Sequence, residues 1–226
     1  SKDATIREIH HRVKNNLQTI SSLLRLQGRR LSTAEARTAI EESVRRIRSI
    51  ALVHEILSRE AGDDVPFVDI VKPVVSMVAD SMISPEHPIR FEVEGDGGVL
   101  PAGVATPLAV VLNELLQNAV DHAYPAELDL TAEPGRVRVE IDRDERTLGL
   151  RVTDDGVGLP DGFELDSSTG LGLSIVRTLV TSDLTGDISV RSGSGGNDRP
   201  GTEVTLRVPI PAENDSDLAA ARPKSR

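Results

Sequence analysis

The segment NELLQNAVDHAY, residues 113–124, combines a helical apolar pattern with polar side chains that can carry chemistry. Glu114 and Asn118 are four residues apart, so they are expected to project together, with His122 one turn further. A carboxylate can act as a base, and an amide oxygen is a ligand that Mg²⁺ accepts. The apolar residues define the opposite, buried face; they are Leu108, Leu112, Leu115, Leu116 and Ala119.

Two glycine-rich clusters flank a polar segment further along the chain. DDGVGLP, residues 154–160, follows a predicted strand, and GLGLS, residues 170–174, opens a predicted helix. Glycine lets the backbone approach a ligand closely, and a helix N-terminus offers unpaired N–H groups to phosphate. The polar stretch 161–169 between them has the character of a lid, and Thr202 begins a late strand in GTEVTLRVP. This order favours a phosphate-binding site.

The first 57 residues predict two amphipathic helices joined by a short turn. A break at 28–33 separates them, and Ser32 or Thr33 can cap the second helix. Such a hairpin buries both apolar stripes poorly by itself, so we expect a homodimer through residues 1–60 that forms a four-helix bundle. The first stripe consists of Ile6, Ile9, Val13, Leu17, Ile20 and Leu24, and the second of Ala36, Ile40, Val44, Ile47, Ala51, His54 and Leu57.

Two adjacent histidines in EIHHRVKNNLQ face different surroundings. At 100° per residue, with Ile6 at zero, His10 falls near 40° and His11 near 140° on the helical wheel. His10 is therefore expected to lean on the core and His11 to face water, on the same face as Asn15. An exposed histidine on an amphipathic helix is most often an ordinary surface residue, so other motifs have to decide its role.

The remaining pattern alternates strands and helices and predicts an α+β fold in which helices cover one face of a sheet. We expect a helical hairpin at 1–60, an α/β sandwich at 61–211 and a disordered tail at 212–226. The predicted strands are 65–67, 89–93, 136–142, 148–153, 187–191 and 203–208, and the predicted helices after the hairpin are 69–82, 107–122 and 173–180.

Composition narrows the class of protein. The 226 residues carry a net charge of −10, yet residues 1–59 hold 12 basic and 6 acidic residues, so a basic hairpin precedes an acidic remainder. With one Tyr, three Phe and no Trp, the chain lacks aromatic platforms for nucleobases, which disfavours direct nucleic-acid binding. The absence of Cys excludes disulfides and Cys-ligated metal sites. No apolar run is long enough to span a membrane, so we expect no membrane contact from this segment and a cytoplasmic location.

Taken in order, these motifs resemble a known family. NELLQNA, DDGVG, STGLGLS and GTEVTL resemble the N, G1 and G2 boxes and the terminal Thr strand of the GHKL ATP-binding fold. HHRVKNNLQ resembles the H-box of the histidine kinases related to the HWE kinases, with the pattern HRxKNxL. The resemblance implies a dimerising phosphotransfer hairpin followed by an ATP-binding domain, as in a sensor histidine kinase.

The resemblance also implies roles for individual residues. His11 matches the phosphoacceptor, Glu114 the acidic residue that activates it, and Asn118 the Mg²⁺ ligand that bridges the phosphates of ATP. The residues implied in nucleotide binding include Asp154, which matches the carboxylate that binds the adenine amino group, with Thr202 supporting it, together with Gly156, Gly158, Gly170 and Gly172. The phosphohistidine would pass its phosphoryl group to an aspartate on a response-regulator receiver domain.

One position departs from the family pattern. Asp121 stands where other histidine kinases often have Lys, so a phosphate contact from this helix would fall to His122. Two other functions remain open: a catalytically silent dimer that binds nucleotide, and another GHKL ATPase or a serine kinase. The hairpin with its H-box argues against the second, because those relatives lack it.

Overall fold

The computed structural model describes residues 2–59, 63–82, 84–167, 171–196 and 198–212. Its first two helices, α1 (Lys2–Gly28) and α2 (Ala34–Leu57), form the predicted hairpin. Thr33 caps α2, because its hydroxyl accepts a hydrogen bond from the Ala36 N–H at 3.2 Å. Two predictions lie outside the described residues: the site residue Gly170 and the tail after residue 212.

The central sheet has five strands in the order β2-β4-β5-β7-β6. Strands β2 and β4 pair in parallel, and every other neighbouring pair is antiparallel. In the order of the sheet, the strands are β2 (Ile89–Glu94), β4 (Gly135–Arg143), β5 (Thr147–Asp154), β7 (Thr202–Pro209) and β6 (Asp187–Ser192). The registers place the end of β5 beside the start of β7, with Asp154 opposite Thr202.

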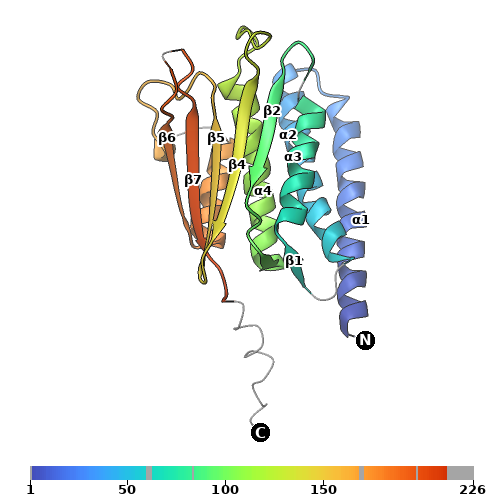
Figure 1. The fold of residues 1–226 in the computed structure, drawn as a ribbon. Coiled ribbons are helices and arrows are strands. Elements are labelled where there is room, and N and C mark those ends of the chain that lie inside the picture. The colour runs from blue at the N-terminus through green and yellow to red at the C-terminus, as the bar shows by residue number, and fades with distance from the viewer. Residues whose placement is uncertain (1, 60–62, 83, 168–170, 197, 213–226) are drawn as a thin grey trace.

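Helices form a second layer against this sheet, as the ribbon of Figure 1 shows. They are α3 (Val68–Met82), α4 (Ala102–Asn118) and α5 (Leu171–Thr178). Helices α4 and α5 continue into the single π-helical turns η1 (Ala119–Ala123) and η3 (Leu179–Asp183), and a short 3₁₀ turn, η2 (Leu165–Ser167), precedes α5. The predicted helix-covered sheet is confirmed.

Two details differ from the sequence prediction. A short strand, β3 (Val99–Pro101), pairs antiparallel with β1 (Asp64–Pro66) in a separate two-stranded sheet. Helix α4 begins at Ala102, five residues before the predicted start at Pro107. Proline disfavours helix interiors, which is why the prediction began there. Burial of Ala105 and a hydrogen bond from the Ala102 N–H to the Asp63 carbonyl at 2.9 Å stabilise the added turn.

The hairpin is not packed as an independent unit. Val53 and Leu57 of α2 are fully buried in the same core as α3, α4 and the sheet, so α2 finds its cover within the chain. Helix α1 lies at the outer edge of the molecule, with α2 between it and α4 (Figure 1). Four large apolar residues of α1 stay exposed: Ile9, Ile20, Leu23 and Leu26. The α2 stripe is therefore covered within the chain, and the second chain expected to cover α1 stays a prediction.

Leu57→Ala tests whether α2 belongs to this core. Removing a fully buried leucine leaves a cavity, and we expect unfolding in urea to show a loss of about 2–5 kcal/mol. As a control, Val99→Ala at an exposed site should change the free energy of unfolding by less than about 0.5 kcal/mol. Equal effects of the two substitutions would contradict the shared core.

Candidate functional site

Asp154 ends strand β5 beside the start of β7, opposite Thr202. The residue is 9% exposed, and its Oδ1 accepts hydrogen bonds from the backbone N–H groups of Gly156 at 3.0 Å and Thr202 at 3.2 Å. Burial raises the pKa of this carboxyl to about 6, against the opposing effect of those two N–H groups. The structure thus brings together Asp154, Gly156 and Thr202, which the sequence analysis had grouped.

Close backbone contacts explain two of the glycines here. A Cβ on Gly156 would lie 2.2 Å from the carbonyl oxygen of Ala123, so no side chain fits between η1 and this loop. Gly158 has a φ of +81°, in the left-handed region that favours glycine. The loop after β5 is therefore pressed against the end of the α4–η1 helix.

Asp155, beside Asp154, anchors the same loop on the outside. Its Oδ1 accepts hydrogen bonds from the Tyr124 hydroxyl at 2.6 Å and from the Arg136 N–H at 2.8 Å, and it pairs with Arg199 at 2.9 Å. Arg199 also donates to the carbonyl oxygens of Asp155 and Glu133. Burial, followed by Asp155, raises the pKa of Tyr124, which keeps its hydroxyl a donor. Sequence reasoning missed this anchor.

A second group gathers where α5 begins beside α4. A Cβ on Gly172 would lie 2.8 Å from Oε2 of Glu114 and 3.7 Å from Oδ1 of Asn118, so these two oxygens face the glycine together. The amide nitrogen Nδ2 of Asn118 is buried without a hydrogen-bond partner. An unpaired buried donor is costly, and an acceptor such as a phosphate oxygen would satisfy it. Glu114, Asn118 and Gly172 therefore form a group with oxygen ligands and an unused donor.

Glu114 does not project from an open face opposite a single buried face, which is where the sequence analysis placed it. Residues 108–117 of α4 are buried all around, and Glu114 is 2% exposed. Arg46 of α2 forms a two-pronged ion pair with it: Nε donates to Oε1, and Nη2 donates to Oε2 at 3.2 Å. No sequence motif marks Arg46, because the helix face was predicted from α4 alone, without the helix that packs on it. The prediction was wrong since α4 is covered on one side by the sheet and on another by α2.

The histidine pair lies on α1 as the helical wheel predicted. His10 is buried at 7% exposure, and His11 is exposed, with its Nδ1 at 3.2 Å from Nδ2 of Asn15. His122 is also exposed, in the π turn after α4, and its expected phosphate contact stays a prediction. Because α1 lies beyond α2 at the outer edge of the molecule, this arrangement does not bring His11 together with the residues of the other two groups (Figure 1).

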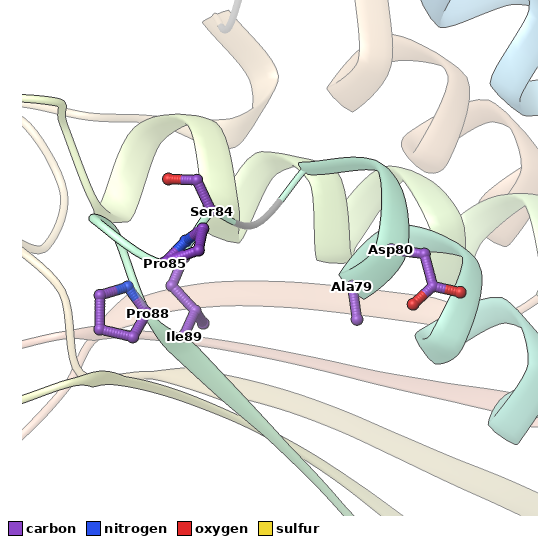
Figure 2. A pocket seen from close by; sticks show the side chains of 6 residues that line it. All are labelled: Ala79, Asp80, Ser84, Pro85, Pro88 and Ile89. Atoms are coloured by element: carbon purple, nitrogen blue, oxygen red, sulfur yellow. The ribbon is translucent and has the colours of Figure 1, made fainter.

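Two surface hollows lie away from these groups. Figure 2 shows one where α3 ends and β2 begins, lined by Ala79, Asp80, Ser84, Pro85, Pro88 and Ile89. The other runs between α1, α2 and α3. Neither contains a residue that the sequence analysis assigned to the site, so the candidate site rests on side-chain geometry.

Membrane-spanning helices and metal-binding clusters are the next features to consider in the described part of the chain. Within it, no helix is both long and apolar enough to cross a membrane. Nor do three or more His, Asp or Glu side chains come together there in a way that would hold a metal ion. The expected role of Asn118 as an Mg²⁺ ligand stays a prediction.

Comparisons with known proteins match two consecutive parts of the chain. The family model described as "Histidine kinase" matches residues 8–82. The model described as "Histidine kinase-, DNA gyrase B-, and HSP90-like ATPase" matches residues 103–212. The second range contains Glu114, Asn118, Asp154 and Thr202, and the first contains His11.

Curated relatives and a solved structure agree with the family models. The chain is 49% identical over 93% of its length to "Sensor histidine kinase PdtaS" of Mycobacterium tuberculosis, and 50% identical over the same share to that of Mycolicibacterium smegmatis. It spans about 40% of the length of both relatives. The histidine kinase domain of the Erythrobacter litoralis EL346 blue-light activated kinase shares the fold, with a TM-score of 0.66, 24% identity, and coverage of 98% of this chain and 97% of that one.

The raised pKa of Asp154 predicts a pH dependence for nucleotide binding. As the pH falls through about 6, the carboxylate takes up a proton and loses its charge as an acceptor, so ATP affinity should fall. Losing a charge-assisted hydrogen bond costs about 1.5–3 kcal/mol, which is about ten- to a hundredfold in Kd. Calorimetric titrations between pH 5 and 8 measure this.

Asp154→Asn is the control for that titration, because ATP itself also changes charge in this range. The variant should bind ATP weakly at every pH, with only the shallow dependence that the nucleotide contributes. A parent and a variant with the same pH profile would place adenine recognition elsewhere.

The Arg46–Glu114 ion pair predicts a large asymmetry between single and double substitutions. Arg46→Met leaves a buried carboxylate without its partner, and we expect a loss of about 3–5 kcal/mol in the free energy of unfolding. Adding Glu114→Gln should recover a substantial part of it. Urea unfolding measures each variant, and Arg48→Met, at an exposed position of the same helix, should change stability by less than about 0.5 kcal/mol. Additive effects of the two substitutions would exclude the pairing.

Proposed function

The chain belongs to the histidine kinases by both of its matched parts, and from this we propose that it is an ATP-dependent histidine autokinase. It phosphorylates its own His11 and passes the phosphoryl group to an aspartate of a response regulator in two-component signalling. The observation that carries the proposal is the setting of Asp154, a buried carboxylate that accepts hydrogen bonds from two backbone N–H groups beside a glycine-containing loop.

The hydrogen bonding of Asp154 suits the amino group of an adenine ring. Because the Gly156 and Thr202 N–H groups both donate to Oδ1, the other carboxylate oxygen can accept from the adenine amino group. Thr202 supports this carboxylate, and Gly156 and Gly158 shape the wall beside it. Asp155 with its partners Tyr124 and Arg199 holds the loop in register.

The group at the start of α5 suits the phosphates. Asn118 provides an amide oxygen for Mg²⁺ and a buried unpaired N–H for a phosphate oxygen, and Gly172 leaves room beside them. When bound, the cation neutralises charge on the phosphates. Glu114 lies on the same side and would accept the proton that the imidazole loses.

The transfer itself needs positioning more than covalent help. One ring nitrogen of His11 attacks the γ-phosphorus, a nitrogen–phosphorus bond forms, and the bond from that phosphorus to the bridging oxygen breaks to release ADP. A neutral imidazole is a competent nucleophile near neutral pH. The exposure of His11 leaves the ring open to a nucleotide and later to a receiver domain.

The arrangement of α1 requires a change of position or a second chain before transfer. His11 lies on α1, which α2 separates from α4, and Glu114 is already paired with Arg46. The exposed residues Ile9, Ile20, Leu23 and Leu26 support a homodimer through residues 1–60, which would bury them against a partner. The catalytic part then comprises residues 61–211. The basic hairpin is complementary in charge to the acidic phosphorylation pocket of a receiver domain, and the two would meet in the cytoplasm.

Two other functions are less well supported. A silent nucleotide-binding dimer would not need an exposed His11 or a glutamate beside the metal ligand. Another GHKL ATPase or a serine kinase would not need the hairpin, whose residues match a histidine kinase model from residue 8 onward.

Incubation with γ-³²P-labelled ATP and Mg²⁺ tests the proposal. We expect the chain to retain label that is lost in acid and stable in base, as phosphohistidine is. His11→Gln should abolish the label while leaving ATP affinity within about twofold, because His11 is far from Asp154 in the fold. Circular dichroism confirms folding. Label retained in His11→Gln, or label stable to acid, would refute the assignment.

A further inference from the structure

Three side chains outside the proposed catalytic groups form a continuous hydrogen-bonded chain, which we call the histidine clasp. It consists of His10 on α1, His54 near the end of α2, and Asp63 just before β1. The two Nδ1 atoms are 2.9 Å apart, and His10 Nε2 is 2.7 Å from Asp63 Oδ1. The rings lie 5.1 Å apart between centroids and are tilted by 38°. The clasp joins the phosphoacceptor helix to its neighbours on two sides.

The clasp contains the one buried side chain in the N-terminal half of α1, His10. The buried residues of this helix are His10, Ser21 and Gly28, so no apolar side chain of α1 is fully covered. Apolar contacts set the rotation of a helix weakly when they are half exposed, whereas hydrogen bonds are directional. Since successive residues are turned by about 100°, holding His10 inward directs His11 outward.

The clasp also reaches the catalytic helix. The carbonyl oxygen of Asp63 accepts a hydrogen bond from the N–H of Ala102, the first residue of α4, at 2.9 Å. Helix α4 carries Glu114 and Asn118. One residue, Asp63, therefore touches the phosphoacceptor helix through its side chain and the catalytic helix through its backbone.

The geometry also limits the protons in the clasp. Asp63 as a carboxylate accepts from His10 Nε2, and the space between the two Nδ1 atoms holds a single hydrogen. Burial, and then the neighbouring His10, lower the pKa of His54, while Asp63 opposes this. Next to His54 in the sequence, Glu55 pairs with Lys14 at 3.7 Å and with Arg59 at 2.6 Å. A proton on both Nδ1 atoms would break the junction.

We propose that Asp63, His10 and His54 are positioning residues for autophosphorylation, which fix the rotation of α1 and its place relative to α4 so that His11 is presented to the nucleotide. This inference rests on the proposed function of His11. It adds residues that contact neither nucleotide nor phosphoryl group and act through the orientation of α1.

The clasp can be tested first without any activity. Nuclear magnetic resonance of ¹⁵N-labelled protein follows the His54 ring from pH 8 to 5, with its signal assigned by a His54→Gln variant. We expect His54 to gain its proton below the ordinary histidine range near 6.5, because burial disfavours its charged form. A His54 ring that titrates within or above that range would overturn the proposal.

Autophosphorylation then tests the effect on the reaction. Asp63→Ala removes the acceptor of His10, and we expect the labelling rate at saturating ATP to fall about tenfold, the value of one hydrogen bond to a charged group, with the Kd for ATP unchanged. Asp63→Asn keeps an acceptor oxygen and should restore most of the rate. The matched control is Asp64→Ala at the adjacent exposed residue, which should label like the parent.

The pH profile separates positioning from simple stabilisation. Because the pKa of His54 is lowered, the clasp is complete above the ordinary histidine range near 6.5 and is lost as the pH falls through the lower folded-state value. The parent rate should fall over this range, and the Asp63→Ala rate should fall less. Equal rates in the parent and Asp63→Ala, or an equal loss in Asp64→Ala, would overturn the proposal. A parent without label would refute the proposed function, and the histidine titration would then decide the clasp alone.

Discussion

The burial of Glu114 is the constraint on which the arrangement of this chain depends. A carboxylate inside a helical core has to be paired, and its partner here is Arg46 of the hairpin. Because Arg46 lies midway along α2, the ion pair places that helix on α4, and Val53 and Leu57 then complete the apolar core below it. Helix α1 follows, since it packs on α2. The pairing of Glu114 with Arg46 thus bears on the placement of three helices: α4, α2 and α1.

The same helix connects this ion pair to Asp154. Beyond Asn118, the helix widens into a π turn that is followed by Tyr124, whose hydroxyl donates to Asp155. Asp155 lies next to Asp154, so a displacement of α4 would act on both groups of the candidate site. Arg199 adds the loop before β7 to this connection. The site is therefore held along the length of one buried helix instead of by its loops alone.

Helix α1 is the exception to this tight packing. It carries His11, yet it has no fully buried apolar residue and is held in its first half by hydrogen bonds. Elements with few buried contacts are the ones that move at the lowest cost in free energy. His11 thus lies on a helix with little buried apolar surface, while Glu114 lies on a helix whose residues 108–117 are all buried. This division suits a reaction in which an acceptor must approach a fixed site.

Much of this was present in the linear pattern. Apolar spacing predicted both hairpin helices, the glycines of DDGVG marked the loop after β5, and the helical wheel separated an inward His10 from an outward His11. His54 also stood in the predicted apolar stripe, and a polar residue at such a position indicates that it has a hydrogen-bond partner. These features are local, because they depend on the direction of a side chain relative to its own helix or strand.

What the tertiary structure alone decided is which element each face meets. Glu114 was expected opposite the only buried face of its helix, but α2 also covers it, and its partner Arg46 lies 68 residues earlier in the chain. Arg46, Asp63 and Arg199 carry no motif, since each acts through a partner far away in the chain. A sequence determines the periodicity of each element. The pairing of charges between elements follows only when the core has brought them together, because burial is what makes an unpaired charge costly.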